Sequence, residues 1–376
     1  MDYARILADR TGKVEFSGIR RFFELAARMK NPCDLSIGQP DYDAPDEMKQ
    51  AAIDAVRAGH NRYTPNAGLP ELREQIVAQL RKEFDGHEPT VLVTSGVSGG
   101  LTLALLATVG PGDEVVFLDP YFVSYVHLVN MVGGKPVTIS SYPDFRFDAA
   151  AVEAAITPRT KVLMVNSPGN PTGRVMTPDE MTAAASIAKR HGLLLISDEI
   201  YDRLCYDAPS PCPLTLAPEH TLALRGFGKT YGVTGWRMGF AAGPAQIIQE
   251  MMKFQQYTFV CAPSIAQYAT LAALKADVSQ HRRDYARKRD LVCELLSPAF
   301  RFVRPGGGFY VFAEVPSQFR SATEFCEIAA EREVLVIPGS VFSRRDTHFR
   351  ISYATTDEML RRGCEKLCEI ARAERR

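Results

Sequence analysis

The chain has 376 residues, and its 44 Lys and Arg balance 44 Asp and Glu, so the formal net charge at pH 7 is zero. Without a net field to attract them, we expect neither nucleic acid nor an acidic membrane as a partner. A hydrophobic content of 46% with 23% charged residues is typical of a globular enzyme, and the length allows one large domain and a smaller one. The first residues lack the apolar centre of a signal peptide and no run is long enough to span a membrane, so we expect a cytoplasmic protein.

The cysteines and histidines show no metal-ligand pattern. The eight cysteines form no CxxC pair, and the seven histidines have no ligand spacing relative to them or to the carboxylates. We therefore expect buried, reduced thiols and no metal site.

The N-terminal region predicts two helices that flank a broken apolar segment. Residues 16–30, FSGIRRFFELAARMK, are amphipathic and predict a helix that docks on another part of the chain. Next, DLSIGQPDYDAP is interrupted at Gly38, where a backbone N–H group could bind a ligand carboxylate or simply form a turn. A helix at 46–58 follows, and Tyr63 then lies in a loop before a helix with Pro70 in its first turn.

Seven apolar runs from residue 91 onward predict buried strands. They are VLVT (91–94), EVVFL (114–118), PVTIS (136–140), KVLMVN (161–166), LLLIS (193–197), TLALRG (221–226) and MGFAAG (238–243). Helix-length segments separate most of them, and this alternation predicts an α/β fold with a mostly parallel, doubly wound sheet. Ligands of such sheets bind at the carboxyl ends of the strands.

Polar or aromatic residues follow five of these runs. SGVSGG follows the first run and leads into a predicted helix at 101–108, whose free N–H groups suit a phosphate. The residues that follow the other runs are Tyr121, Phe122 and Tyr125 after the second, Asn170 after the fourth, Asp198 and Tyr201 after the fifth, and Lys229 after the sixth. Each has a structural alternative, such as an N-cap, a turn residue or a core aromatic. Together they predict one site at one edge of the sheet.

The stretch from Arg225 to Arg237, RGFGKTYGVTGWR, places Lys229 between two pairs of glycines. Glycines permit positive φ angles and the close approach of a bulky ligand. A lysine in a water-poor pocket loses its proton easily and can attack a carbonyl carbon to form a Schiff base. Arg237 suits a phosphate. Taken alone, these residues are more typical of a solvated loop than of a catalytic site.

A nucleotide-binding loop is a competing interpretation of the same stretch. ALRGFGKT at 223–230 fits the looser phosphate-loop pattern, and LLLISDE at 193–199 is similar to a magnesium-binding strand. Against it, LAPEH precedes the motif where a strand should end, and Gly232 and Gly235 would interrupt the helix that should begin at Lys229. The acidic strand also comes before the loop, which reverses the usual order.

After residue 250 the pattern changes. Long helical segments lead to FRFVRPGGGFYVFAEV, a helix at 321–332, EVLVIPGSVF, HFRISYA and a terminal helix, so strands and helices are segregated as in a small α+β domain. We expect a large domain at 45–275 and a small domain built from 1–44 and 276–376.

Considered together, these residues resemble the class I/II aminotransferases, the pyridoxal-phosphate enzymes of fold type I. The resemblance covers nearly the whole chain, and the segments NPTG, DEIY, K-x6-GWR and FRISYA in this order carry most of it. It implies transfer of an amino group from an L-amino acid to a 2-oxo acid by a ping-pong mechanism through pyridoxamine phosphate.

The resemblance implies a role for each site residue. Lys229 would form the Schiff base with pyridoxal phosphate and move the proton, Asp198 would face the pyridine nitrogen, and Tyr201 and Asn170 would donate to the 3′ oxygen. Val97, Ser98 and Arg237 would hold the phosphate and Phe122 would stack on the ring. Arg350, with Gly38, would bind the substrate carboxylate. Tyr63 would reach the phosphate of a neighbouring subunit, which implies a homodimer with shared sites.

Some positions depart from the family pattern. Gly228 replaces a common serine, Gly226 stands where a hydroxyl is frequent, and GVSGG replaces a turn that often carries a bulkier residue or a lysine. No second arginine has a family-like context for a distal carboxylate, although Arg20 and Arg21 are expected near the mouth of the site. The amino donor stays open, and a C–S β-lyase on the same fold is the alternative activity.

Overall fold

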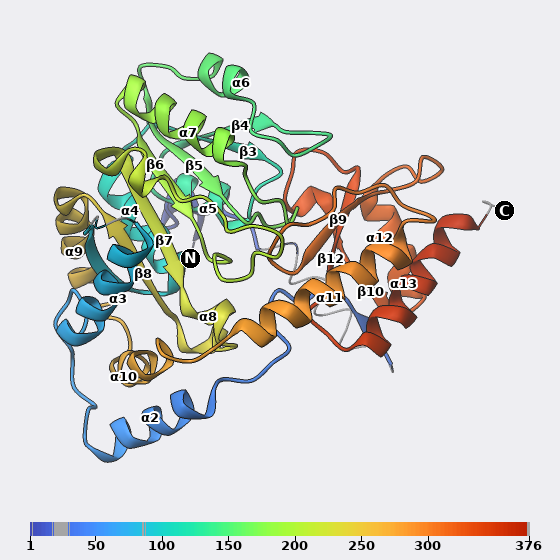
Figure 1. The fold of residues 1–376 in the computed structure, drawn as a ribbon. Coiled ribbons are helices and arrows are strands. Elements are labelled where there is room, and N and C mark those ends of the chain that lie inside the picture. Colours follow the sequence, from blue (N-terminus) through green and yellow to red (C-terminus); the bar gives the residue numbers. More distant parts are fainter. Residues whose placement is uncertain are drawn as a thin grey trace.

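The computed structural model of the chain describes residues 1, 3–16, 18, 29, 31–84, 86 and 88–373 (Figure 1). Most of the amphipathic helix predicted at 16–30, including Ile19 and Arg20, lies outside the described residues.

A seven-stranded sheet forms the centre of the larger part of the molecule. Its strands are β2 (Thr90–Ser95), β3 (Glu114–Asp119), β4 (Lys135–Ser140), β5 (Thr160–Asn166), β6 (Leu194–Asp198), β7 (Thr221–Gly226) and β8 (Met238–Gly243). The order is β2-β8-β7-β6-β5-β3-β4. All neighbouring strands are parallel except for the two antiparallel pairs that β8 forms with β2 and β7. The predicted mostly parallel sheet is confirmed.

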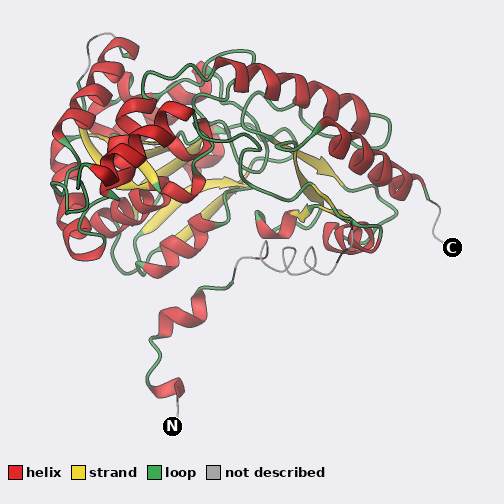
Figure 2. Ribbon diagram, turned by 90° about the horizontal axis from the view of Figure 1, so that it is seen from below, coloured by secondary structure: helices red, strands yellow, loops and turns green. Residues whose placement is uncertain are grey.

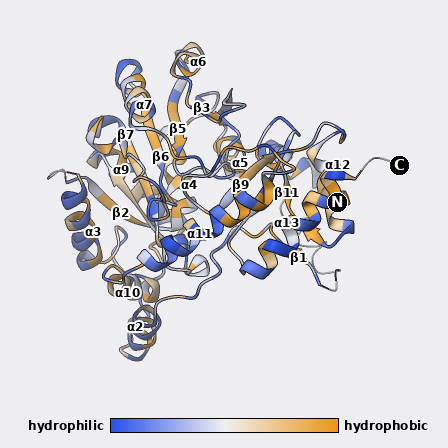
Figure 3. Cartoon of the chain, turned by 45° about the vertical axis from the view of Figure 1, so that its right-hand side comes forward, coloured by the Kyte–Doolittle hydropathy of each residue, from blue (hydrophilic) through white to orange (hydrophobic). Residues whose placement is uncertain are grey.

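Both faces of this sheet are covered by helices, as Figures 1 and 2 show. The helices of this part are α2 (Asp46–Arg57), α3 (Pro70–Glu83), α4 (Gly96–Thr108), α5 (Ser124–Met131), α6 (Ala149–Ala154), α7 (Pro178–His191), α8 (Phe227–Thr230), α9 (Ala245–Thr258) and α10 (Ser264–Ala273). Along β5, Val162 and Met164 pack with α4, α5 and α9, whereas Leu163 and Val165 pack with α7 on the other face. Because both faces are buried, the strands read as continuous apolar runs, and they appear hydrophobic in Figure 3.

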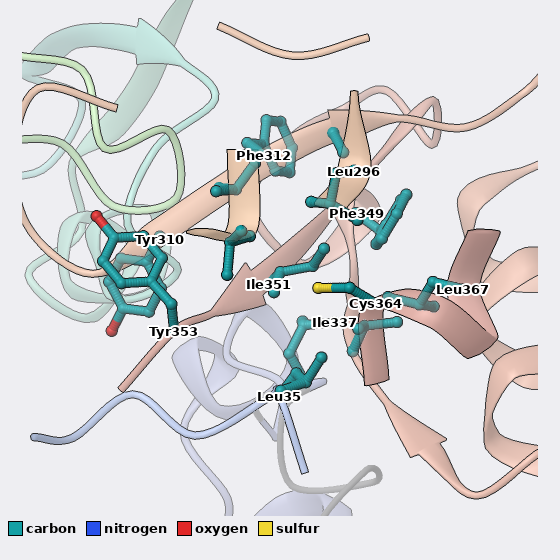
Figure 4. Close-up of a cluster of buried hydrophobic side chains, with 14 of the residues drawn as sticks. Leu35, Leu296, Tyr310, Phe312, Ile337, Phe349, Ile351, Tyr353, Cys364 and Leu367 are labelled. Atoms are coloured by element: carbon teal, nitrogen blue, oxygen red, sulfur yellow. The ribbon is translucent and has the colours of Figure 1, made fainter. Parts of the chain in front are cut away.

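The smaller part combines an antiparallel sheet with three helices. The strands β9 (Tyr310–Glu314), β11 (Ile337–Pro338) and β12 (His348–Ser352) form a sheet of order β11-β12-β9, and α11 (Ser279–Leu296), α12 (Ala322–Glu331) and α13 (Asp357–Arg372) pack around it. One buried cluster joins these elements (Figure 4), in which Leu296, Phe349 and Leu367 are fully buried.

The N-terminal segment belongs to this cluster as well. Strand β1 (Cys33–Asp34) pairs in parallel with β10 (Val334–Leu335), and Leu35 is fully buried among residues of the C-terminal part. The two ends of the chain therefore pack together, while the exact domain limits at 44/45 and 275/276 stay predictions.

One predicted element boundary is wrong. Helix α4 begins at Gly96, five residues before the predicted start at 101. Three glycines in GVSGG lower the helix propensity of this turn. Gly100, however, packs tightly against Leu224, since a Cβ added at Gly100 would lie 3.1 Å from Cδ2 of Leu224. Tertiary packing thus favours the helical turn.

Among the described residues, no helix is long and apolar enough to cross a membrane, and no group of three or more His, Cys, Asp or Glu side chains could hold a metal ion.

Candidate active site

A cavity of about 460 Å³ lies where the carboxyl ends of the central strands meet the smaller sheet. Its wall includes every residue to which the resemblance assigns a role, apart from Tyr63; Tyr121 and Tyr125 do not line it. The lining residues are Ile37, Gly38, Gln39, Gly96, Val97, Ser98, Leu101, Phe122, Asn166, Asn170, Asp198, Ile200, Tyr201, Gly228, Lys229, Thr234, Arg237, Met238, Tyr310 and Arg350. Both parts of the molecule therefore build the cavity.

Lys229 lies in the single turn of α8, directly after β7. Its Nζ atom donates a hydrogen bond to the backbone oxygen of Gly38, and the hydroxyl of Tyr42 donates to the backbone oxygen of Lys229 over 2.6 Å. Burial and, to a smaller extent, the positive charges of Arg350 and Arg237 together lower the pKa of Lys229 to about 8. Near neutral pH Lys229 is therefore still mostly protonated, but its uncharged, nucleophilic form is far more populated than that of a solvated lysine.

Asp198 is the last residue of β6 and is buried. Its Oδ2 atom accepts a hydrogen bond from the Tyr125 hydroxyl at 2.7 Å, and Oδ1 accepts one from the Ile200 backbone N–H at 3.2 Å. Burial raises the pKa of Asp198 to about 6, although both hydrogen bonds act in the opposite direction. A cationic group at this place would hold the carboxylate in its charged form.

Asn166 connects the residues around Asp198 and was not predicted as a site residue. It donates from Nδ2 to the backbone oxygen of Asp198 at 2.9 Å and accepts at Oδ1 from the backbone N–H of Asn170 at 2.8 Å. Its position could have indicated this role, because Asn166 is the polar residue that ends the apolar run KVLMVN.

The first turn of α4 and Arg237 together line one end of the cavity, here called the cup, and its chemistry would suit an anion. The helix has no side-chain cap at its N-terminus, so its first N–H groups are free. Gly96 has a φ of +68°, and a Cβ there would lie only 2.8 Å from Nη2 of Arg237. The cup therefore depends on glycine at this position.

Neighbouring atoms lie close to two glycines near Lys229. A Cβ at Gly226 would lie 2.4 Å from Cδ1 of Ile200, and one at Gly228 would lie 3.3 Å from Cα of Thr234. Bulkier neighbours thus occupy this space, and Thr234 itself lines the cavity.

Arg350 projects from β12 into the opposite wall and is almost fully buried. Its Nη1 atom donates to Oδ1 of Asn170 at 2.9 Å and its Nη2 atom to the backbone oxygen of Ser36 at 2.8 Å. The guanidinium lies 4.3 Å from the ring centre of Tyr310 and 4.7 Å from that of Phe342. The Nε atom is buried without a hydrogen-bond partner among the described residues, so this cation is fixed in place and can still donate to an anion.

Aromatic side chains complete the wall. The Tyr201 hydroxyl donates to that of Tyr310 at 3.2 Å, and burial raises the pKa of both phenols. Phe122 meets Tyr125 edge to face, with 5.7 Å between the ring centres. Tyr310 was not predicted, although the motif GGGFYVF contains it.

Among the residues to which the resemblance assigns a role, Tyr63 is the one that the cavity does not include. Its side chain is 81% exposed in the loop between α2 and α3.

The nucleotide-binding interpretation of ALRGFGKT is wrong. Helix α8 has only four residues, so no extended helix presents its N-terminus to a nucleotide phosphate. The amine of Lys229 instead contacts Gly38 inside the cavity.

Known proteins are similar to this chain over nearly its whole length. A family model described as "Aminotransferase class I and II" matches residues 30–367. An aspartate/prephenate aminotransferase of Thermus thermophilus is 40% identical over 89% of this chain and 90% of its own length. An aromatic-amino-acid aminotransferase of Thermococcus litoralis is 35% identical over 98% of this chain and 99% of its own. The solved structure of an aspartate aminotransferase from Thermus thermophilus with maleate superimposes with a TM-score of 0.93 at 38% identity, covering 97% and 99% of the two chains.

Proposed function

Because the chain belongs to the class I and II aminotransferases and is a transaminase of fold type I, we propose that it binds pyridoxal phosphate in the cavity around Lys229 and moves an amino group from an L-amino acid to a 2-oxo acid. The family depends on this cofactor in general. The observation that carries the proposal is the position of Lys229, Asp198 and Arg350 in the wall of one cavity.

The residues present fit the cofactor. Its phosphate suits the uncapped first turn of α4 with Arg237, where Val97 and Ser98 provide N–H groups and a hydroxyl. Asp198 suits the pyridine nitrogen, because a protonated ring would stabilise this buried carboxylate. Asn170 and Tyr201 supply polar side chains for the 3′ oxygen, and Phe122 supplies an aromatic face.

When bound, pyridoxal phosphate supplies an aldehyde that condenses with amines and a ring that accepts electrons from the α-carbon of the substrate. Lys229 would hold the cofactor through this aldehyde, and its amine would serve as the acid and base that moves the substrate α-proton. Its lowered pKa suits both roles near neutral pH.

Arg350 holds the substrate by its α-carboxylate. The guanidinium is already oriented by Asn170 and Ser36, so little side-chain entropy is lost on binding. With the carboxylate on Arg350, the backbone around Gly38 lies beside the reacting amine, because Lys229 contacts its oxygen. This orientation defines which bond at the α-carbon is presented to Lys229.

The test is a half-reaction. Purified protein is loaded with pyridoxal phosphate, and an L-amino acid is added without an acceptor. We expect stoichiometric formation of pyridoxamine phosphate and one 2-oxo acid, followed by return of the pyridoxal form when a different 2-oxo acid is added. Lys229→Ala should abolish both steps, whereas Lys253→Ala, at an exposed position on α9, should change neither. A protein that takes up the cofactor but yields no 2-oxo acid from any amino acid contradicts the proposal.

The same experiment separates transamination from C–S β-lyase activity, for which Lys229 and Arg350 would serve equally. A lyase would release pyruvate and a thiol from cystathionine in repeated turnovers with no acceptor present. A transaminase stops after one.

We also propose a homodimer in which Tyr63 completes the cup of the partner. Support comes from exposed apolar side chains, namely Tyr63 in the loop before α3 and Phe254, Tyr257, Phe259 and Val260 at and just beyond the end of α9. Phe259 lies near the cup, because a Cβ at Gly99 in the first turn of α4 would lie 3.9 Å from its ring. Exposed apolar groups of this kind favour burial against another chain.

Sedimentation of the purified protein tests the assembly. We expect a dimer, and a strictly monomeric protein with full activity contradicts it. Tyr63→Phe should weaken cofactor binding and leave the dimer intact. A cytoplasmic location stays a prediction from the sequence.

A further inference from the structure

We propose that the substrate of this enzyme is an amino acid with an uncharged side chain, so that the cavity selects apolar or neutral donors over aspartate and glutamate. This inference rests on the proposed function and identifies its substrate class. It follows from a comparison of the charged side chains in the cavity wall with the cofactor and substrate groups that each of them already serves in the proposed function.

Four of the twenty lining residues are charged: Asp198, Lys229, Arg237 and Arg350. In the proposed function Asp198 faces the pyridine nitrogen and Lys229 carries out the chemistry. Arg237 binds the phosphate and Arg350 the α-carboxylate. Within the described wall, no cation is left for a second substrate carboxylate.

The position of the substrate side chain follows from the two residues that would hold the substrate, Arg350 and Lys229. Arg350 contacts the backbone oxygen of Ser36 and Lys229 that of Gly38, so a substrate that joins both anchors lies along residues 36–39. The wall there includes Ile37 and Gln39 from this segment, and Thr234 lies beside Gln39, since Thr234 Oγ1 lies 3.5 Å from Gln39 Oε1. All three side chains are neutral.

Charges just beyond this wall do not favour an anion. Asp41 follows Gln39 by two residues and is held by Lys288 and by the Tyr285 hydroxyl, which donates to Asp41 Oδ1 at 2.9 Å. The charge of Lys288 is therefore already neutralised by a carboxylate. A distal carboxylate in the cavity would lose its hydration without gaining a partner, whereas an apolar side chain gains by leaving water.

The wall also has the shape for an apolar group. Tyr310 presents its ring to Arg350, and its hydroxyl would lie 3.0 Å from a Cβ at Gly38. Ile37 and Tyr310 both line the cavity, and the Tyr310 ring lies beside the carboxylate anchor.

The decisive experiment measures binding rather than turnover. N-phosphopyridoxyl adducts of L-methionine, L-glutamine and L-glutamate are stable analogues of cofactor and substrate joined through a single C–N bond. Their dissociation constants for the full-length, cofactor-free protein can be measured by calorimetry. Glutamine and glutamate have nearly the same shape and differ in charge. The ratio of the dissociation constants of their adducts therefore measures the effect of the charge alone. We expect the glutamine adduct to bind about tenfold more tightly than the glutamate adduct, and the methionine adduct to bind at least as tightly as the glutamine adduct.

A variant pair tests the position of the side chain. Gln39→Arg adds a cation at the mouth and should raise the affinity for the glutamate adduct relative to the methionine adduct by about tenfold. Gln39→Met introduces a side chain of similar length without a charge, and this variant should still bind the methionine adduct more tightly than the glutamate adduct. If Gln39→Arg leaves the ratio unchanged, the side chain does not lie along residues 36–39 and the inference is wrong in its geometry.

The outcomes separate this inference from the proposed function. If no adduct binds more tightly than pyridoxamine phosphate alone, the proposed function fails. If the glutamate adduct binds as tightly as the other two or more so, the enzyme is a transaminase but the inferred selectivity is wrong. The double substitution of Arg20→Ala and Arg21→Ala then shows whether the cation comes from that segment.

Discussion

The guanidinium of Arg350 donates from Nη1 to the side-chain oxygen of Asn170 over 2.9 Å, and this bond joins two residues that are 180 positions apart. Arg350 lies on β12 of the smaller part and Asn170 in the loop after β5 of the larger part. In the proposed function, Asn170 thus lies on the cofactor side of the cavity and fixes the group that would bind the substrate carboxylate.

This bond can be tested by changing its charge. In Asn170→Asp, the new carboxylate would pair with Arg350 and compete with the carboxylate of the substrate. We expect KM for amino donors to rise about tenfold or more, because an ion pair must be broken before binding. Asn170→Ala removes the bond without adding a charge and should raise KM less. Steady-state kinetics with one donor measures both, and equal KM values for the two variants would contradict this role.

The pKa of Lys229 predicts the pH at which it reacts. Burial, together with the charges of Arg350 and Arg237, lowers this pKa from 10.5 to about 8. In the cofactor-free protein, modification of Lys229 by an amine-specific reagent, followed by mass spectrometry, should have its midpoint near pH 8. Arg350→Met should move the midpoint upward, since it removes one of the two charges. A wild-type midpoint near 10.5 would show that Lys229 is solvated.

The same shift has a consequence for stability. Between pH 8 and 10.5 the unfolded chain holds the Lys229 proton and the folded chain has lost it. The contribution of Lys229 to the free energy of unfolding therefore rises with pH in this range.

The raised pKa of Asp198 predicts that a neutral residue at this position increases the stability of the protein but impairs its function. Its pKa is raised from 3.8 to about 6, so its contribution to stability is complete below pH 3.8 and is lost as pH rises through 6. In the cofactor-free protein above pH 6, Asp198→Asn should therefore be more stable than the wild type, by up to about 2 kcal/mol after loss of hydrogen bonding to Tyr125 is included. The variant should bind the cofactor weakly and transfer amino groups slowly. Urea denaturation at pH 4 and pH 7 measures the first effect, and an equal difference at both pH values would contradict it.

The cup predicts a specific effect of Gly96→Ala. At Gly96 the φ of +68° and the contact of 2.8 Å with Arg237 both oppose a Cβ, so the variant should lose stability and phosphate affinity together. Gly112→Ala is the matched control, because its φ is +82° and nothing lies within 4 Å of the added Cβ. The control should lose only about 1 kcal/mol of stability and no phosphate affinity. Fluorescence titration with pyridoxal phosphate distinguishes the two.

Much of the fold was predictable because burial leaves a strong pattern. The seven central strands begin and end within one residue of the apolar runs that predicted them, since both of their faces are covered. The start of α4 was not predictable, because packing against Leu224 outweighs the low helix propensity of its glycines.

The site was predictable where polar residues follow strands and less so where contacts join distant segments. Lys229 and Asp198 follow apolar runs directly, so their place at one edge of the sheet could be inferred. Asn166 acts through hydrogen bonds to the backbones of Asp198 and Asn170, and these appear only in the folded chain. Tyr310 reaches the cavity from β9, whose packing on β12 no local pattern indicates.

The central claim is that Lys229 alone bonds covalently to the cofactor. The direct measurement is reduction of the pyridoxal-phosphate-loaded protein with borohydride, followed by proteolysis and mass mapping of the phosphopyridoxyl group. The account predicts one modified peptide that contains Lys229, and none from Lys229→Arg. A stoichiometric label on another lysine, with Lys229 unmodified, would contradict it.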